Sequence, residues 1–174
     1  MKKQDTIRPI DFVVALTLAV RPESADATYA QLGHMLGVSS STTFASVSRL
    51  QRSGMLRPGT HEPNLRELRG FVEFGVKHVF PAAFGPQTRG VPTAYSGPVL
   101  KDRFDSTNAI VWPDTQGAVR GTALKPLYPQ APGLANRELK IYHALTLVDA
   151  VRVGRARERK AALEALDEAI VEGV

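Results

Sequence analysis

The sequence contains no cysteine and no long hydrophobic run, and each absence excludes a class of protein. Without cysteine the chain can form neither disulfides nor thiolate metal sites, which fits a reducing compartment. The longest largely apolar run, residues 12–20, is too short to span a bilayer, and the N-terminus lacks the cleavage pattern of a signal peptide. We therefore expect a cytoplasmic protein with no membrane association.

The sequence also lacks the motifs of common active sites. Its 4 histidines are scattered, without the spacing of a metal-binding pair. Neither a glycine-rich phosphate-binding loop nor a Gly-x-Ser-x-Gly nucleophile turn occurs. These absences predict that the protein is not an enzyme and uses no cofactor or metal. A catalytic site assembled only by the fold is the alternative.

Length, composition and charge are those of a soluble globular protein. The 174 residues can form one domain with a good core or two small ones, and the formal net charge is +5. The distribution of charge along the chain is more informative than the net charge, because residues 28–59 contain no acid but carry Arg49, Arg52 and Arg57. A surface built from this segment is locally positive, which suits nucleic acid but also occurs in many proteins that never bind it.

Residues 28–56 have the pattern of two short helices joined by a tight turn. Thr28 is a good N-cap for the first helix, and Gly37 permits the left-handed turn that ends it. Ser39 caps a second helix, which stops at Gly54. This pattern predicts a helix-turn-helix.

The two sides of the second helix differ in chemistry. A helical wheel places Thr43, Val47 and Leu50 on one side, with Phe44 and Gln51 at its edges. The opposite side carries hydroxyls, one small residue and two arginines, without any acid: Ser41, Thr42, Ala45, Ser48, Arg49 and Arg52. Such a face suits the major groove of DNA, and an ordinary solvated helix face is the alternative.

Two motifs mark the turn and the end of the second helix. The turn reads Leu-Gly-Val-Ser at 36–39, and the helix end reads Arg-Leu-x-x-x-Gly followed by two apolar residues at 49–56. Both resemble the winged-helix DNA-binding domains of bacterial transcriptional regulators, including the MarR-like group. Thr43 departs from the Val or Ile usual in that family. Only residues 57–63 precede the next helical pattern, so a wing must be very short or missing.

The resemblance implies that the second helix enters the major groove of double-stranded DNA. The residues expected near base edges are Ser40, Ser41, Thr42, Ala45 and Ser48. Those expected to anchor phosphates are Ser39, Arg49, Arg52 and Arg57. Thr28 and Tyr29 are further candidates for a phosphate contact, although Tyr29 is equally consistent with a core or surface tyrosine.

Helices are also predicted before and after this unit. Residues 9–20 form a first helix that packs across the other two. Another helix begins at Asn64, with Glu67 as its capping-box partner and Gly75 as its end. The apolar side of this helix is suited either to a dimer interface or to packing within the monomer.

Residues 76–134 are rich in proline and glycine and show no helical period. Short strands are predicted at 77–80 and 108–112, with 117–124 returning from the second strand. The intervening loop, residues 80–98, can serve as an anion-binding or backbone-binding surface, and a structural wrap is the favoured alternative. Its polar candidates are Thr88, Arg89, Thr93, Tyr95 and Ser96. Residues 76–158 also resemble uncharacterised bacterial proteins, which implies no activity.

The whole pattern predicts a mainly α fold with a small β component. It comprises a helix-turn-helix DNA-binding domain, winged or not, at 1–63, and a linking helix with a Pro/Gly-rich α+β region at 64–134. A C-terminal helical region follows at 135–174, where Asn136 caps the first helix and dimerisation is an option. The predicted function is that of a homodimeric, sequence-specific transcriptional repressor. The alternative is an antitoxin-like or adaptor protein whose C-terminal half binds a protein partner.

Overall fold

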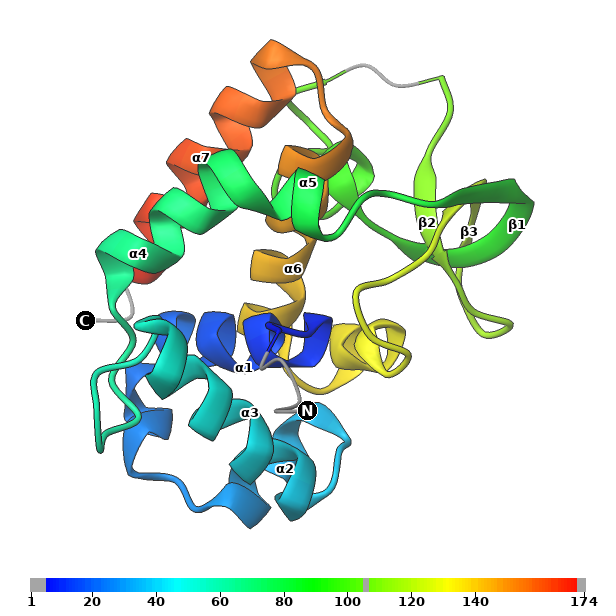
Figure 1. The fold of residues 1–174 in the computed structure, drawn as a ribbon. Helices are drawn as coiled ribbons and strands as arrows, with labels where there is room; N and C mark the ends of the chain where they lie inside the picture. The colour runs from blue at the N-terminus through cyan, green and yellow to red at the C-terminus, as the bar shows by residue number, and fades with distance from the viewer. Residues whose placement is uncertain (1–5, 105–106, 172–174) are drawn as a thin grey trace.

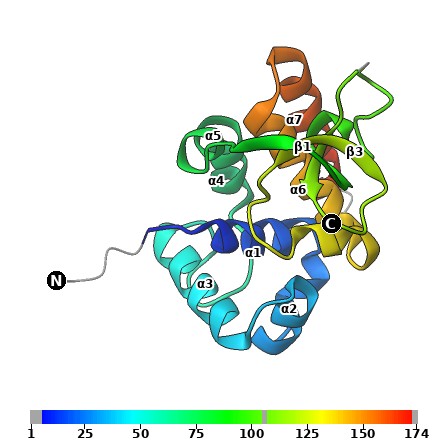
Figure 2. The same cartoon turned by 90° about the vertical axis from the view of Figure 1, so that its right-hand side faces the viewer.

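The computed structural model describes residues 6–104 and 107–171, so the last three residues of the predicted C-terminal region lie outside it. A group of three helices forms one end of the molecule, and the remaining helices and a small sheet form the other (Figures 1 and 2). The α-helices are α1 (Pro9–Val20), α2 (Tyr29–Leu36), α3 (Ser40–Ser53), α4 (Leu65–Gly70), α5 (Val76–Val79), α6 (Leu139–Val153) and α7 (Ala156–Val171). The strands are β1 (Phe84–Pro92), β2 (Ile110–Pro113) and β3 (Val119–Leu124). The mainly α prediction with a small β component is confirmed.

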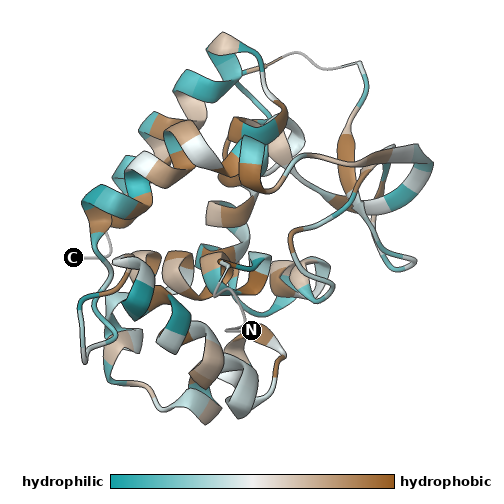
Figure 3. Ribbon diagram, in the orientation of Figure 1, coloured by the Kyte–Doolittle hydropathy of each residue, from teal (hydrophilic) through white to brown (hydrophobic). Residues whose placement is uncertain are grey.

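Helix α1 joins the two ends of the molecule. Every residue from Asp11 to Val20 is buried, because α1 packs against α3 on one side and against α6 and α7 on the other. Apolar residues occur all around α1 and α6, as expected for helices with no solvent-facing side (Figure 3). In spite of this apolar character, no helix in the described part of the chain is long and apolar enough to cross a membrane.

The predicted ends of α2 and α3 are confirmed. Thr28 accepts a hydrogen bond from the Gln31 amide at 3.2 Å, and Ser39 accepts one from the Thr42 amide at 3.1 Å. Gly37 and Gly54 end the two helices in the left-handed conformation, with φ of 69° and 79°. These local interactions set the length of both helices and the turn between them.

The helix after α3 departs from the prediction. Asn64 makes no side-chain cap, so the expected capping box with Glu67 is wrong. Gly75 does not end the helix either, because a π-helical turn, Phe71–Gly75, carries it on to α5. The predicted strand at 77–80 is therefore helical. A β-carbon at Gly75 would lie only 2.9 Å from the Phe71 ring, so glycine there makes room for an aromatic side chain rather than a helix end.

The predicted loop at 80–98 contains the longest strand. β1 pairs antiparallel with both β2 and β3, and β2 pairs parallel with β3, which closes the sheet into a three-stranded barrel. The expected antiparallel return of 117–124 onto 108–112 is thus wrong, although strands do occur in both segments. Glycine permits this tight closure, because a β-carbon at Gly90 would lie 2.1 Å from the carbonyl oxygen of Trp112.

One buried carboxylate ties this barrel to α6. Asp149 accepts hydrogen bonds from Thr93 Oγ1 at 2.8 Å, Trp112 Nε1 at 2.6 Å and Arg152 Nη1 at 2.6 Å. Burial raises the pKa of the Asp149 carboxyl, while Arg152 and the other two donors oppose that shift. Arg152 also donates to the carbonyl of Phe80 at 2.9 Å, so the same pair holds the end of α5.

The start of α6 is later than predicted. A 3₁₀ turn, Ala131–Asn136, comes first, and the helix begins only at Leu139. Asn136 is therefore not its N-cap. Glu138 holds the N-cap position without a side-chain cap and instead receives a hydrogen bond from Arg21 Nη1. A long-range ion pair has displaced the local capping interaction that the sequence favours.

Replacing Gly90 with alanine should destabilise the barrel. The added β-carbon would collide with backbone, which cannot move aside as a flexible side chain can, so we expect a loss of about 3 kcal/mol in the free energy of unfolding. Gly70 is the matched control because nothing lies within 4 Å of its added β-carbon. Gly70→Ala should gain about 0.5–1 kcal/mol from the reduced entropy of the unfolded chain. Urea denaturation followed by circular dichroism measures both changes, and equal stability of Gly90→Ala and the unmodified protein would contradict the closure.

Candidate nucleic-acid interface

The outer side of α3 is the side that carries Ser41, Thr42, Ala45, Ser48, Arg49 and Arg52. α3 lies at the end of the molecule that α1, α2 and α3 form, away from the barrel (Figure 1). Its inner side is formed by Thr43, Ser46, Val47 and Leu50, all buried against α1 and α2. The turn that connects α2 to α3, residues 37–39, packs closely on α2, since a β-carbon on Gly33 would lie 2.6 Å from the carbonyl oxygen of Val38. The inner side therefore fixes how the outer side is presented.

Hydroxyl groups cluster at the first turn of α3. Ser39 Oγ lies 3.0 Å from Ser41 Oγ and 2.8 Å from Thr42 Oγ1, in addition to capping the helix. Ser40 is exposed beside them. Hydroxyls that already share hydrogen bonds are held in place, and each retains donor or acceptor capacity for a partner.

The middle of the outer side is also polar and small. Ser48 Oγ donates to the carbonyl of Phe44 at 2.9 Å, which leaves its oxygen free to accept. Ala45 and Ser48 are half-buried, and Ser41 is exposed. These side chains leave space in which a ligand can approach the helix closely.

Arg49 does not fit the phosphate role expected of it. Its Nε and Nη2 donate to the two oxygens of Asp11 at 2.7 and 2.6 Å, and only 11% of its side chain is exposed. Asp11 is fully buried and also accepts from the Arg8 amide at 2.8 Å. The first turn of α1 packs on the side of α3 that the helical wheel predicts to face solvent. The charge of Arg49 is therefore neutralised inside the protein.

The other two arginines of the segment lie at the surface. Arg52 is exposed on the outer side of α3. Arg57 is exposed as well and pairs with Glu62 at 3.2 Å. Residues 57–62 form a short loop closed by a single antiparallel bridge between Leu56 and Pro63. The segment where a wing would stand is therefore reduced to this loop.

An aromatic row runs beside these polar residues. Phe44 is 55% exposed, and its ring meets that of Tyr29 edge-on at 5.3 Å between centroids. Tyr29 contacts the ring of His61 at the same distance. The sequence places Phe44 only at the edge of the buried side, so its exposure was not predicted. Its four-residue spacing from Ser40 and from Ser48 is the signal that could have revealed it.

The polar residues expected to form a surface in 80–98 do not come together. Thr93 is buried on Asp149, and Ser96 accepts a hydrogen bond from the Ile110 amide at 3.0 Å. Thr88 and Arg89 instead lie in β1. These five residues therefore do not form one shared surface, and the segment builds the barrel, which agrees with the favoured structural alternative.

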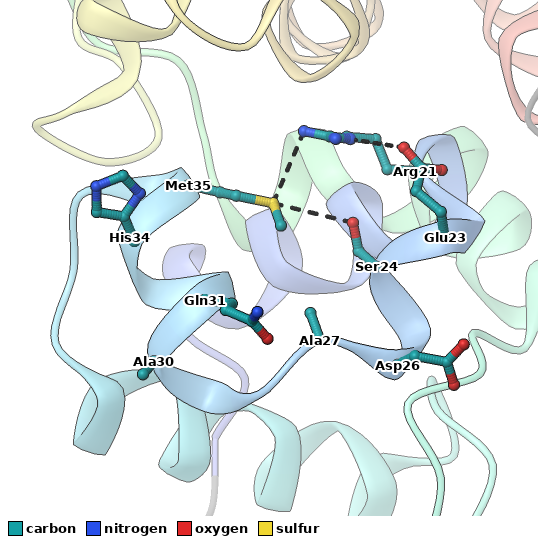
Figure 4. Close-up of a pocket in the computed structure, with 9 residues that line it drawn as sticks. All are labelled: Arg21, Glu23, Ser24, Asp26, Ala27, Ala30, Gln31, His34 and Met35. Atoms are coloured by element: carbon teal, nitrogen blue, oxygen red, sulfur yellow. Dashed lines mark hydrogen bonds and ion pairs between the residues drawn. The ribbon is translucent and has the colours of Figure 1, made fainter.

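A groove of about 600 Å³ lies between α2 and the 3₁₀ turn Pro22–Asp26 (Figure 4). Arg21 lines it but already pairs with Glu23 at 2.9 Å and with Glu138. Met35 Sδ lies 3.8 Å from Arg21 Nη1. The groove therefore offers no free cation for an anionic ligand, and no group of three potential metal-ligating residues occurs among residues 6–104 and 107–171.

No protein-family model matches the chain, and no curated protein or solved structure shows a significant match to it. The resemblance to winged-helix regulators thus stays a prediction.

Removing Arg49 should mainly reduce stability. Arg49→Ala would leave Asp11 buried without its counter-charge, so we expect the free energy of unfolding to fall by about 3–5 kcal/mol. The double variant Asp11→Leu with Arg49→Met should recover most of this loss, because it removes both charges and fills the space. Chemical denaturation tests both. A fully stable Arg49→Ala protein with weakened binding to every DNA sequence would instead restore the phosphate role.

Proposed function

We propose that the protein is a homodimeric, sequence-specific DNA-binding transcriptional regulator that represses the genes it binds. One observation carries the proposal: the outer side of α3 presents hydroxyls, a small residue and Arg52 without any acid. A helix of this shape and charge fits the major groove, where hydroxyls reach base edges and arginine reaches phosphate or guanine.

The proposed contacts follow the geometry of the two helices. Base edges are read by Ser40, Ser41, Thr42, Ala45 and Ser48. Phosphates are contacted by Ser39, Arg52, Arg57, Thr28 and Tyr29. Arg49 is left out because Asp11 holds it. Thr28 is the N-cap of α2, so the amides of the first turn of α2 add to the positive potential proposed to face the DNA backbone.

The short loop 57–62 makes a second copy necessary on this proposal. A single helix-turn-helix without a developed wing buries a small area on DNA, roughly 600–1,000 Å². Two copies on a roughly palindromic site double the contacts and set the spacing of the half-sites. Sequence-specific binding by this chain is therefore proposed to require a homodimer.

Exposed apolar side chains support an interface after α3. Leu65 is 39% exposed, Phe74 70% and Val79 47%, and all three lie along the continuous helical segment from α4 through α5. We propose that these exposed apolar side chains belong to a surface that another subunit covers. α6 packs behind this segment, and α7 contacts it through the bonds of Arg69 to Asp167 and of Arg159 to the Glu73 carbonyl.

Replacing Phe74 with serine should shift the protein from dimer to monomer. The side chain is mostly exposed in the single chain, so folding should be unaffected while apolar area is lost from the interface. Leu139→Ser is the control, because Leu139 is 57% exposed at the start of α6, outside the proposed interface. Sedimentation velocity distinguishes the two states. If the unmodified protein sediments as a monomer at concentrations that saturate its DNA, the dimer is excluded.

The DNA-binding proposal is tested by fluorescence anisotropy with the duplex upstream of the protein's own gene and with a scrambled duplex. We expect a preference for the upstream duplex that survives near-physiological salt. Arg52→Ala should lower the slope of log affinity against log salt by roughly one for each bound protomer, because one phosphate contact is lost. Arg155→Ala removes an exposed charge from the connection between α6 and α7, outside the helix-turn-helix, and should leave the slope unchanged. Weak, equal binding to both duplexes that disappears with salt would refute the proposal.

A second candidate function is that of an antitoxin-like or adaptor protein, and one feature of the barrel favours it. Arg89 of β1 lies directly opposite Arg120 of β3, and both are exposed. Neither forms an ion pair with any residue that the structure describes. Like charges opposite each other on two strands are destabilising. Binding of an acidic protein partner would therefore reduce the repulsion between Arg89 and Arg120. Co-purification of a second protein that is lost in Arg120→Glu would support this function.

A further inference from the structure

The aromatic side chain on α3 has no role in the protein's own core. Phe44 is 55% exposed, whereas its neighbours on the outer side are serines and an alanine. The buried residues of α3 that pack against α1 and α2 are Thr43, Ser46, Val47 and Leu50, and Phe44 is not among them. A phenyl ring exposed among small polar side chains is available for contact with an apolar group of a partner.

The ring of Phe44 is held in one orientation before any ligand arrives. It meets Tyr29 at an interplanar angle of 86°, and Tyr29 in turn packs on His61. His61 Nδ1 lies 3.1 Å from the carbonyl oxygen of Ala25, which fixes the far end of the row. Because α2, α3 and the loop 57–62 all contribute, the ring loses little rotamer freedom on binding.

The position of Phe44 on α3 places it among the proposed base-reading residues. Ser40, Phe44 and Ser48 follow one another at intervals of four residues and so form one ridge of the helix. Ser40 and Ser48 cannot both approach base edges without bringing Phe44 into the groove between them. The ring must then meet whatever apolar group the groove offers.

The major groove offers one apolar group, the C5 methyl of thymine. A phenyl ring has no hydrogen-bonding group that could read the other base edges. We propose that Phe44 determines specificity by packing on a thymine methyl in each half-site, with Tyr29 as the positioning residue behind it. This inference rests on the proposed function and adds the base chemistry that α3 recognises.

The experiment begins with selection of duplexes from a random library by the purified full chain. Each thymine of the selected site is then replaced singly by deoxyuridine, which removes only the methyl group. We expect one thymine in each half-site at which this change weakens binding roughly four-fold, the value for one buried methyl-sized group. Phe44→Ala should bind the thymine and deoxyuridine duplexes equally at that position, and Phe44→Leu should retain part of the difference.

Phe84→Ala is the matched control, because that phenyl ring is 56% exposed but lies on β1, outside the helix-turn-helix. It should keep the full methyl dependence. A selected sequence that shows no deoxyuridine effect, or the same effect in Phe44→Ala, would overturn the inference and leave the proposed function standing. Failure of the library to yield any preferred sequence would overturn both. A changed sedimentation coefficient of Phe44→Ala without DNA would assign the ring to a protein interface instead.

Discussion

The complete burial of α1 is the constraint on which the rest of the structure depends. A helix with apolar residues on all sides is stable only if other elements cover it all around. α3 and the residues before α2 cover one side, and α4, α6 and α7 cover the other. The buried apolar cluster therefore runs without a break from Leu36 and Val47 to Val148 and Leu166. The inner side of α3 therefore belongs to the same core as the barrel and the C-terminal helices.

Two buried carboxylates fix the geometry of this core. Apolar packing alone tolerates small shifts between helices, whereas a buried charge requires its partners at hydrogen-bonding distance. Asp11 joins α1 to α3 through Arg49, and Asp149 joins α6 to the barrel through Thr93 and Trp112. Each carboxylate is satisfied by several donors, so the cost of its burial is offset by specific bonds. The two ends of the molecule are thus held to the central helices by polar contacts of defined direction.

The sequence predicts those features that are determined by neighbouring residues. Thr28 and Ser39 cap helices within their own first turns, and Gly37 and Gly54 need only their own backbone conformation, so α2 and α3 were located correctly. The sequence does not predict features that depend on contacts between residues far apart in the chain. Arg49 finds its partner 38 positions away in the chain, and a helical wheel contains no information about that contact.

The Pro/Gly-rich region shows the same limit. Glycine at Gly90 suggests a loop when only local propensity is considered, but in the structure it allows backbone to approach the carbonyl of Trp112. Gly75 similarly suggests a helix end, yet the ring of Phe71 lies against it and packs on Phe12 and Phe80. At Gly90 a contact with a distant strand requires the small residue, and at Gly75 the ring of Phe71, four residues earlier, requires it. In both places the glycine is needed for close packing and marks neither a loop nor a helix end.

The positive charge of residues 28–59 is engaged by the protein's own acids more than the sequence suggests. Arg49 is bound to Asp11, and Arg57 lies beside Glu62. On the proposed function, fewer phosphates are neutralised per protomer than the three arginines would allow, so the sequence-independent part of the affinity is small. Discrimination between sequences must then come from hydroxyls held by their own hydrogen bonds and from a ring held by Tyr29. A recognition surface of this kind gains specificity from rigidity and shape, because wrong sequences lose contacts that little electrostatic attraction can replace.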